Sequence, residues 1–174
     1  MVKSPPNVQQ KIIVIGNLPY NIANELISKL VRKQHLFERL VFLVQKEVAQ
    51  RWVASHVFYK NKYSALSITL NYFCQTELVF DVPKYFFKPQ PPVDGAVVSF
   101  EFRDNLAANF PTEAFFTFTR SCFRFRRKTL LNNLKSFRGK ESLIRNAFMQ
   151  LDLHEKVRPQ DLSIGQYLKL FAIT

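Results

Sequence analysis

Glycine is scarce in this sequence. Only four glycines occur in 174 residues, and no two of them lie close enough to form a Gly-x-Gly. Loops that hold the phosphates of a nucleotide or dinucleotide cofactor use closely spaced glycines, because the backbone must approach the ligand without side chains in the way. The sequence therefore contains no glycine-rich cofactor loop.

Cysteine, histidine and long apolar runs are also scarce. Cys74 and Cys122 lie far apart and form no Cys-x-x-Cys, which favours a reduced protein over a disulfide-stabilised secreted one. His35, His56 and His154 lack the spacing of metal ligands, so we expect no metal. No uncharged run is long enough to span a membrane, and the first ten residues lack the apolar core of a signal peptide. We therefore expect a soluble, cytoplasmic protein with no membrane partner.

Acidic residues are outnumbered as well. The chain has 13 Asp+Glu against 25 Lys+Arg, so its formal net charge is +12. This excess favours a polyanionic partner, with nucleic acid first and an anionic membrane surface second, although a merely basic soluble protein has the same composition. Hydrophobic residues make up 47% of the chain and aromatic residues 14%, so a core can form and wholesale disorder is not expected.

The sequence KIIVIGNLPYNI at residues 11–22 organises the rest of the chain. Its apolar part is short, β-branched and ends at Gly16, which predicts a buried strand. Pro19 fixes its own φ and biases the residue before it away from the helical region, so residues 17–20 form a stiff, extended corner. In open α/β sheets, ligands bind just beyond the carboxyl ends of strands, where this corner is expected.

Asn17, Leu18, Pro19 and Tyr20 supply groups that could hold a nucleobase amine. Such an amine has two N–H donors, which the Asn17 carboxamide oxygen and the backbone carbonyl of Leu18 or Pro19 could accept. The Tyr20 ring could stack on a base that has been lifted out of its helix. The alternative interpretation is a strand-end turn with a capping Asn and a packed Tyr.

Helices and strands alternate up to residue 102, and only helices are expected after it. The expected strands after the first are at 40–45, 77–82 and 97–102, and the expected helices in this part are at 21–33, 46–54 and 63–73. The last of these also fits a strand. A long connection at 84–95 contains prolines that make it extended and irregular. The later helices are expected at 111–123, 128–137, 141–151 and 163–171, with a capping box formed by Ser163 and Gln166.

Residues 120–140 contain eight cations and no acid. Phe123, Phe125 and Phe137 are interleaved with them. Cations neutralise phosphates and aromatic rings stack on bases, so we expect this segment to bind RNA, although a solvated face with its phenylalanines in the core is the alternative. The eight candidate RNA-binding residues are Arg120, Arg124, Arg126, Arg127, Lys128, Lys135, Arg138 and Lys140.

Five segments, taken in chain order, resemble the signatures of one family. They are NLPYNI at 17–22; QKEVA at 45–49 with Arg51; VP at 82–83 with FKPQPPVDGAVV at 87–98; RKTL at 127–130 with Asn133 and Leu134; and Arg158 with Leu162 and Ser163. Together they make the chain, from residue 11 onward, similar to the small-subunit ribosomal RNA adenine dimethyltransferase family.

The resemblance implies an α/β fold, in which part of a Rossmann-like methyltransferase sheet precedes a small all-helical domain. Residues 1–104 would be the C-terminal part of the catalytic domain, and residues 105–174 a helical RNA-binding domain. The implied activity is S-adenosylmethionine-dependent N6,N6-dimethylation of two adjacent adenines in small-subunit ribosomal RNA, during ribosome biogenesis. The implied partners are ribosomal RNA and the small ribosomal subunit.

The resemblance also assigns roles to individual residues. The residues at 17–20 would be catalytic, and Asn17 would also lie against the cofactor. Tyr20 would stack on one side of the flipped base and Phe87 would cover the other. Pro92 stands where the family usually has Lys, and Gly95 where it usually has Ser, with little expected effect on the chemistry.

The larger departure concerns the cofactor. In the family, roughly the first third of the protein precedes the strand that ends in Asn-Leu-Pro-Tyr and carries the glycine-rich loop. We therefore expect this chain to be the C-terminal portion of such an enzyme, inactive alone and binding S-adenosylmethionine weakly or not at all. Its first strand would expose an apolar edge, which invites self-association. The alternatives are a non-catalytic remnant that binds ribosomal RNA or the ribosome, a large-subunit RNA adenine methyltransferase that confers macrolide resistance, and a mitochondrial transcription-factor relative.

Overall fold

The computed structural model describes residues 11–19, 21–104, 106, 110–135, 137 and 141–174, and its centre is a mixed four-stranded sheet of order β1-β2-β4-β3. β1 (Ile12–Asn17) runs parallel to β2 (Phe37–Gln45). β4 (Gly95–Phe102) runs antiparallel to both β2 and β3 (Cys74–Val82). The predicted α/β class is confirmed.

β2 begins three residues earlier than the sequence pattern predicted. Glu38 and Arg39 interrupt the apolar run, so the pattern marked only the part of the strand from residue 40. In the sheet, Arg39 is in register with Glu101 of β4, and their side chains form an ion pair of 3.0 Å. Cross-strand pairs of opposite charge support strand pairing, so the charged residues extend β2.

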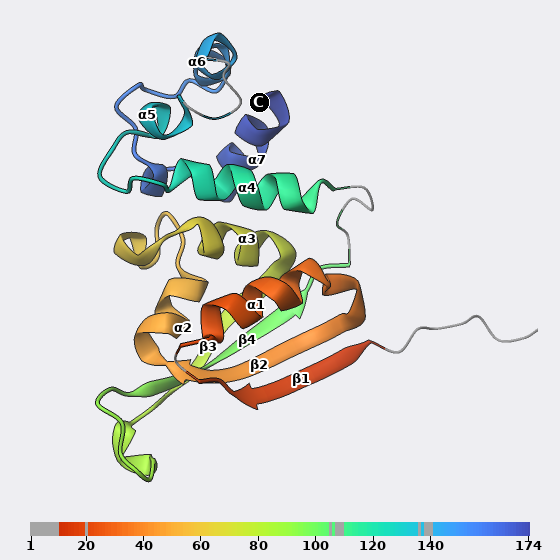
Figure 1. The fold of residues 1–174 in the computed structure, drawn as a ribbon, viewed down its shortest axis with the longest axis vertical. Helices are drawn as coiled ribbons and strands as arrows, with labels where there is room; N and C mark the ends of the chain where they lie inside the picture. The colour runs from red at the N-terminus through yellow and green to blue at the C-terminus, as the bar shows by residue number, and fades with distance from the viewer. Residues whose placement is uncertain (1–10, 20, 105, 107–109, 136, 138–140) are drawn as a thin grey trace, which may run out of the picture.

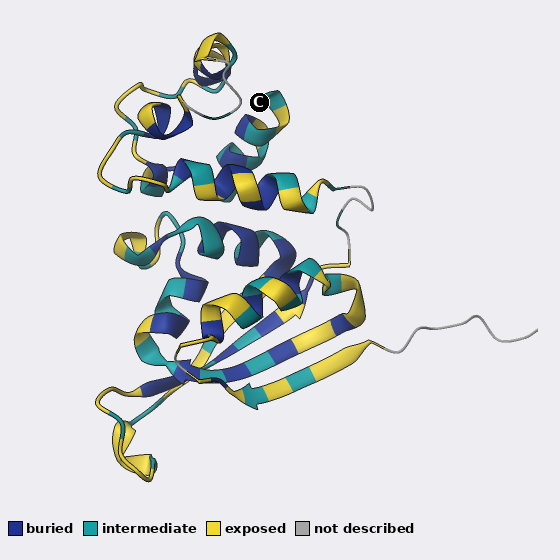
Figure 2. Ribbon diagram, in the orientation of Figure 1, coloured by how far each residue is buried: buried dark blue, intermediate teal, exposed yellow. Residues whose placement is uncertain are grey.

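Three helices cover one face of the sheet (Figure 1): α1 (Ala23–Arg32), α2 (Lys46–Val53) and α3 (Ala65–Phe73). Along β2, Leu40, Phe42 and Val44 are buried while the residues between them are partly exposed (Figure 2). Successive side chains of a strand point to opposite faces, so the buried set marks the face under the helices.

The ambiguous segment at residues 63–73 forms helix α3, as predicted. The Ser64 side chain accepts a hydrogen bond from the backbone N–H of Ser67, and the Ser67 side chain accepts one from the backbone N–H of Ser64. These two hydrogen bonds form a capping box. α3 lies between the sheet and the next helical layer (Figure 1). A helix covered on two sides is apolar nearly all round, which explains why its sequence lacks a clear helical stripe.

The last part of the chain forms a helical layer stacked on α3 (Figure 1). It contains α4 (Thr112–Cys122), α5 (Leu130–Leu134), α6 (Glu141–Gln150) and α7 (Ile164–Ile173). The capping box of Ser163 and Gln166 is confirmed at the start of α7. α5 is shorter than predicted, because Thr129 caps its first turn by accepting from the N–H of Asn132.

Aromatic side chains join the helical layer to the α/β part. Tyr72 lies 4.5 Å from Phe110 and 5.3 Å from Phe115 between ring centroids, and Phe73 stacks on Phe116 at 6.1 Å. The buried residues of both parts belong to one continuous apolar cluster. The two parts therefore share one apolar core, and the division of the chain into two domains at residue 104 remains a prediction.

β1 lies at the edge of the described sheet, and no described strand pairs with its outer side. The strand is present, but the prediction that it is buried is wrong for the described structure, because the side chains of Ile13 and Ile15 are 54% and 78% exposed. The described helices lie over the opposite face of the sheet from the one on which these two residues stand (Figure 1). Of the helices within the described ranges, none is long and apolar enough to cross a membrane.

Candidate functional site

The corner after β1 is held by backbone hydrogen bonds on both of its sides. Asn17, the last residue of β1, is in register with Leu43 of β2, and the N–H of Leu18 donates to the Leu43 carbonyl at 3.0 Å. The N–H of Ile22 donates to the Pro19 carbonyl at 3.3 Å and leads the chain into α1. The Leu18 side chain is buried, whereas Asn17 and Pro19 are exposed. The predicted stiff corner at the carboxyl end of a strand is thus present.

Asn17, Leu18, Pro19 and Phe87 line one open cavity of about 280 Å³. Phe87 comes from the connection between β3 and β4, far along the chain from the corner. Ligand sites for drug-sized molecules usually measure about 300–1,000 Å³, so this cavity suits a single planar ring. The structure therefore brings together four of the five residues predicted to be catalytic, and the fifth, Tyr20, lies outside the described residues.

Two hydrogen-bond acceptors at the corner are unoccupied. Among the described residues, none donates to the Asn17 side chain or to the Leu18 carbonyl. The Pro19 carbonyl, by contrast, already accepts from Ile22. The sequence left open whether the second acceptor would be the Leu18 or the Pro19 carbonyl, and both remain candidates, because a carbonyl oxygen has two lone pairs.

The loop that carries Phe87 is fastened at its base. The Asp94 carboxylate accepts from the Lys84 N–H at 2.9 Å, and the Asp94 carbonyl accepts from the Lys46 N–H at 3.0 Å. The Lys46 ammonium lies 2.6 Å from Asp81, and this hydrogen bond raises the pKa of Lys46. These bonds tie the loop to the start of α2, which places two of the segments that resemble family signatures in direct contact.

Gly95 has a packing role that sequence reasoning missed. A Cβ at this position would lie 3.1 Å from Leu43 Cδ1 and 3.2 Å from Phe87 Cζ. Contacts this short force neighbouring atoms to move, since protein interiors are closely packed. The absence of a side chain at Gly95 therefore allows the Phe87 ring to lie close to the sheet.

The described cations of the basic segment differ in exposure. Arg124, Arg127, Lys128 and Lys135 are exposed, as is Arg120 at the end of α4. Arg126 is only partly exposed, and two further candidates, Arg138 and Lys140, lie outside the described residues.

Arg126 binds protein backbone. Its guanidinium donates to the Tyr63 carbonyl at 2.7 Å, to the Lys60 carbonyl at 3.2 Å and to the Asn61 carbonyl. The donors of a guanidinium form a rigid fork, and here several of them bind one loop. Arg126 therefore joins the helical layer to the connection between α2 and α3, and Lys60 adds an ion pair with Asp161 at 2.8 Å.

The three phenylalanines of the segment have different surroundings. Phe123 packs edge-on against Tyr63 at 6.0 Å, and Phe137 packs against Phe118 at 5.6 Å, so both anchor the segment in the core. Phe125 is 55% exposed and lies beneath the Arg124 guanidinium at 5.2 Å. Phe125 is therefore the most exposed of the three rings, and the binding of RNA by this segment remains a prediction.

Asn133 holds the loop that displays these cations. Its side chain is buried, accepts from the Phe125 N–H at 2.7 Å and donates to the carbonyls of Phe125 and Thr129 at 3.0 Å. A buried amide whose partners are all backbone groups fixes the path of the chain. This explains why an Asn stands in the segment RKTLLNNL, a role that no spacing rule would have revealed.

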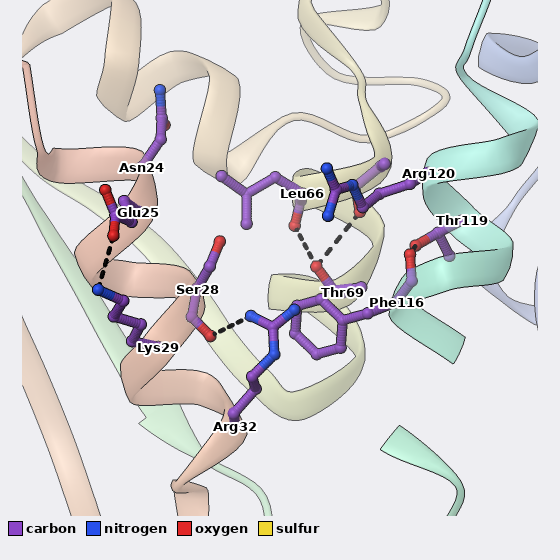
Figure 3. A pocket seen from close by; sticks show the side chains of 11 residues that line it. Asn24, Glu25, Ser28, Lys29, Arg32, Leu66, Thr69, Phe116, Thr119 and Arg120 are labelled. Carbon is purple, nitrogen blue, oxygen red and sulfur yellow. Dashed lines mark hydrogen bonds and ion pairs between the residues drawn. The ribbon is translucent and has the colours of Figure 1, made fainter. Parts of the chain in front are cut away.

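A larger cavity, of about 650 Å³, lies between α1, α3 and α4. Side chains of α1 and α4 face each other across it (Figure 3). Arg32 bridges the two helices, because it donates to Glu113 at 2.7 Å and lies 4.1 Å above the Phe116 ring. Neither the corner nor Phe87 lines this cavity, but Arg120 does, which separates Arg120 from the other predicted RNA-binding residues.

Neither a metal site nor a catalytic cysteine is supported in the part of the chain that the structure describes. No group of three or more His, Cys, Asp or Glu residues there could hold a metal ion. Cys74 and Cys122 are free thiols, and burial raises the pKa of each. A buried protonated thiol is a poor nucleophile, so neither cysteine is a candidate for covalent catalysis.

Comparison with solved structures defines the class of protein. A dimethyladenosine transferase from Plasmodium falciparum superposes with a TM-score of 0.72 and 26% identity, covering 91% of this chain and 64% of that one. The 23S ribosomal RNA methyltransferase ErmE superposes with a TM-score of 0.67 at 19% identity, covering 99% of this chain and 67% of that one, which shows the fold alone. The architecture is that of the Rossmann-like methyltransferases.

The family follows from the sequence comparisons. The model of the ribosomal RNA adenine dimethylase family matches residues 2–174, and the chain belongs to this family, which confirms the predicted resemblance. The ribosomal RNA small subunit methyltransferase A of Mycoplasma mobile is 36% identical over 98% of this chain. The chain spans 65% of the length of that relative.

Proposed function

We propose that this chain takes part in the S-adenosylmethionine-dependent N6,N6-dimethylation of two adjacent adenines in small-subunit ribosomal RNA. The observation that carries the proposal is the cavity in which Asn17, Leu18, Pro19 and Phe87 meet, in a member of the ribosomal RNA adenine dimethylase family. The relative in Mycoplasma mobile is named for the small subunit, which favours that RNA over the large-subunit alternative.

The corner residues would hold the amine of the target adenine. One N–H of the amine would donate to the Asn17 carboxamide oxygen and the other to the Leu18 carbonyl, the two acceptors without partners among the described residues. Two acceptors on one amine orient its nitrogen toward the methyl donor. Because the corner is already fixed by backbone hydrogen bonds, little reorganisation is needed when the base binds.

Phe87 would form one wall of the base site. Its ring lines the same cavity as Asn17 and packs close to Gly95. Aromatic rings stack on bases that are extruded from a helix, which compensates for the stacking that the base loses in the RNA. We assign Tyr20 to the other face of the base, as the family resemblance implies.

S-Adenosylmethionine would supply an activated methyl group. The open cavity of about 280 Å³ at the corner has room for a base. Of the described residues we assign only Asn17 to the cofactor, because it is the polar side chain at the carboxyl end of β1. The cavity therefore suits the adenine that accepts the methyl group.

The exposed cations of the basic segment would contact RNA phosphates. Arg124, Arg127, Lys128 and Lys135 are exposed in the described part of the segment, and each phosphate contact releases counterions. Arg126 would position the segment rather than bind RNA, since its guanidinium is engaged by three backbone carbonyls.

The test is methyl transfer to small ribosomal subunits that lack the modification. Because the chain is expected to be inactive alone, it is joined to the part of the Mycoplasma mobile relative that it does not cover. This joined protein is incubated with the subunits and labelled S-adenosylmethionine, and N6,N6-dimethyladenosine is measured by mass spectrometry after digestion of the RNA. The proposal predicts dimethylated adenines at two adjacent positions, with loss of product for Asn17→Ala. Binding to the subunits without any methylation would instead support the non-catalytic alternative.

A further inference from the structure

The connection between β3 and β4 carries an aromatic pair that the proposed site does not use. Tyr85 and Phe86 are 69% and 70% exposed, which makes them the most exposed aromatic side chains of the described residues. Their ring centroids lie 4.7 Å apart. Most of both rings faces solvent, so the pair is available to a partner.

The backbone beneath the pair is fixed. The N–H of Phe86 donates to the Pro83 carbonyl at 3.1 Å, and the N–H of Phe87 donates to the Lys84 carbonyl at 3.2 Å. The Asp94 carboxylate, which accepts from the Lys84 N–H, closes the loop behind them. An ordered turn therefore holds two rings in water, and leaving such apolar area exposed is unfavourable.

The pair lies beside the candidate base site. Phe87, the next residue, lines the cavity with Asn17. The connection projects from the end of the sheet, away from the helical layer (Figure 1), and its tip is exposed (Figure 2). A nucleotide next to the target base would therefore pass close to the two rings.

The charges around the pair favour RNA over an apolar protein surface. Lys84 and Lys88 flank the aromatic residues, both are exposed, and among the described residues neither forms an ion pair with a carboxylate. No acidic residue occurs at positions 83–93. Aromatic rings combined with unpaired cations are what unpaired nucleotides bind, through base stacking and phosphate contacts.

We propose that Tyr85 and Phe86 stack on an unpaired nucleotide adjacent to the target adenine and so hold the RNA at the base site. This inference rests on the proposed function, because it uses the same RNA and the same cavity. The added contact would make the protein prefer RNA loops in which a nucleotide next to the target adenine is unpaired, since stacking requires a base that is free of its own helix.

The first experiment measures binding of a synthetic RNA hairpin whose loop holds two adjacent adenines, with 2-aminopurine placed in turn at each flanking position. We expect the wild-type chain to quench the fluorescence at one flanking position. The double variant Tyr85→Ala/Phe86→Ala should lose this quenching and bind about tenfold more weakly, which corresponds to about 1.4 kcal/mol.

Two controls separate stacking from other effects. Tyr85→Phe/Phe86→Tyr keeps both rings and should retain the quenching and the affinity. Met149→Ala removes an apolar side chain that is 79% exposed on α6, and it should behave as wild type. Unchanged quenching and affinity in the double alanine variant would overturn the inference.

A second experiment uses only the wild-type chain. A photoactivatable 4-thiouridine at the quenched position should cross-link to Tyr85 or Phe86, as mapped by mass spectrometry of the digested protein. Cross-links confined to other segments would overturn the inference. So would loss of self-association in the double alanine variant with RNA binding intact, because the rings would then contact a second copy of the chain.

The two proposals fail in different ways. If the hairpin binds and Asn17→Ala abolishes methylation, but the aromatic variants match wild type, the inference is wrong and the proposed function stands. If the wild-type chain does not bind the hairpin, the inference is wrong, and the proposed function is decided by methyl transfer to the ribosomal subunits alone.

Discussion

The corner at residues 17–19 and the basic segment at residues 120–140 were both expected to engage RNA, but they are organised differently. The corner residues all line one cavity with Phe87. The cations of the basic segment are divided among an exposed loop, a structural contact at Arg126 and the cavity beside α1 that Arg120 lines. A short motif with a proline and a backbone hydrogen bond on each side has few accessible conformations, whereas the conformation of a loop between helices depends on what the loop packs against.

The largest expected effect concerns the corner. In the chain joined to the uncovered part of the Mycoplasma mobile relative, Asn17→Ala should reduce single-turnover methyl transfer by about 100-fold or more, because it removes one of two preorganised acceptors for the amine. The affinity for the RNA hairpin should change less than about twofold, since the phosphate contacts lie elsewhere. Equal losses in rate and affinity would show that the corner only contacts RNA. The corner and the basic segment would then not differ in function.

The next effect concerns the scaffold of the basic segment. Asn133→Ala should lower the free energy of unfolding by about 2 kcal/mol, because it leaves partly buried backbone groups of Phe125 and Thr129 without their partner. The matched control is Asn132→Ala on the exposed side of the same helix, which should change stability by less than about 0.5 kcal/mol. Chemical denaturation followed by circular dichroism measures both. Equal stabilities would show that the loop does not need its buried amide.

A pair of neighbouring arginines should separate structure from RNA binding. Arg126→Ala should lower the free energy of unfolding by about 1.5 kcal/mol, because three carbonyls lose a charged donor. Arg127→Ala should leave stability unchanged and lower the slope of log K against log salt by about 0.7–0.9. The salt slope is measured by fluorescence anisotropy of the hairpin. A reduced salt slope for Arg126→Ala with no loss of stability would show that Arg126 contacts RNA and is not needed to hold the loop at residues 60–63.

The smallest expected effect concerns Gly95. Gly95→Ala should lower the free energy of unfolding by about 1 kcal/mol, because its Cβ would press on Leu43 and on the Phe87 ring. Displacement of Phe87 should also reduce quenching of 2-aminopurine placed at the target position. Gly165→Ala, where a Cβ would meet only Ser163 Oγ at 3.9 Å, is the control and should be no less stable than wild type, because Ala is a better helix former than Gly. If Gly95→Ala has the stability and the quenching of wild type, the Phe87 ring can move away from the added Cβ without a loss of stability.

Much of the α/β part was predictable because its elements have local causes. The short β-branched run before Gly16 and the proline of the corner specify β1 and its exit, as the structure confirms. The capping box at Ser163 was also local, and it begins α7. Residues 63–73 were harder, since a helix buried on two sides shows no stripe in its sequence.

The parts that were missed depend on partners distant in sequence. Nothing near Arg126 in the sequence indicates that its guanidinium binds carbonyls of residues 60–63. Gly95 was treated as a departure with little consequence, and its role appears only because Phe87 packs beside it. The early start of β2 likewise depends on Glu101, which lies on another strand.

The sequence by itself determined the α/β class, the stiff corner at residues 17–20, the excess of positive charge and the family, because each depends on residue types and short spacings. Only the tertiary structure decided that Phe87 meets Asn17 across a cavity, that Arg126 is engaged while its neighbours are exposed, and that Tyr85 and Phe86 are presented to solvent. Those outcomes depend on the packing of segments far apart in the chain, and spacing along a sequence does not specify that packing.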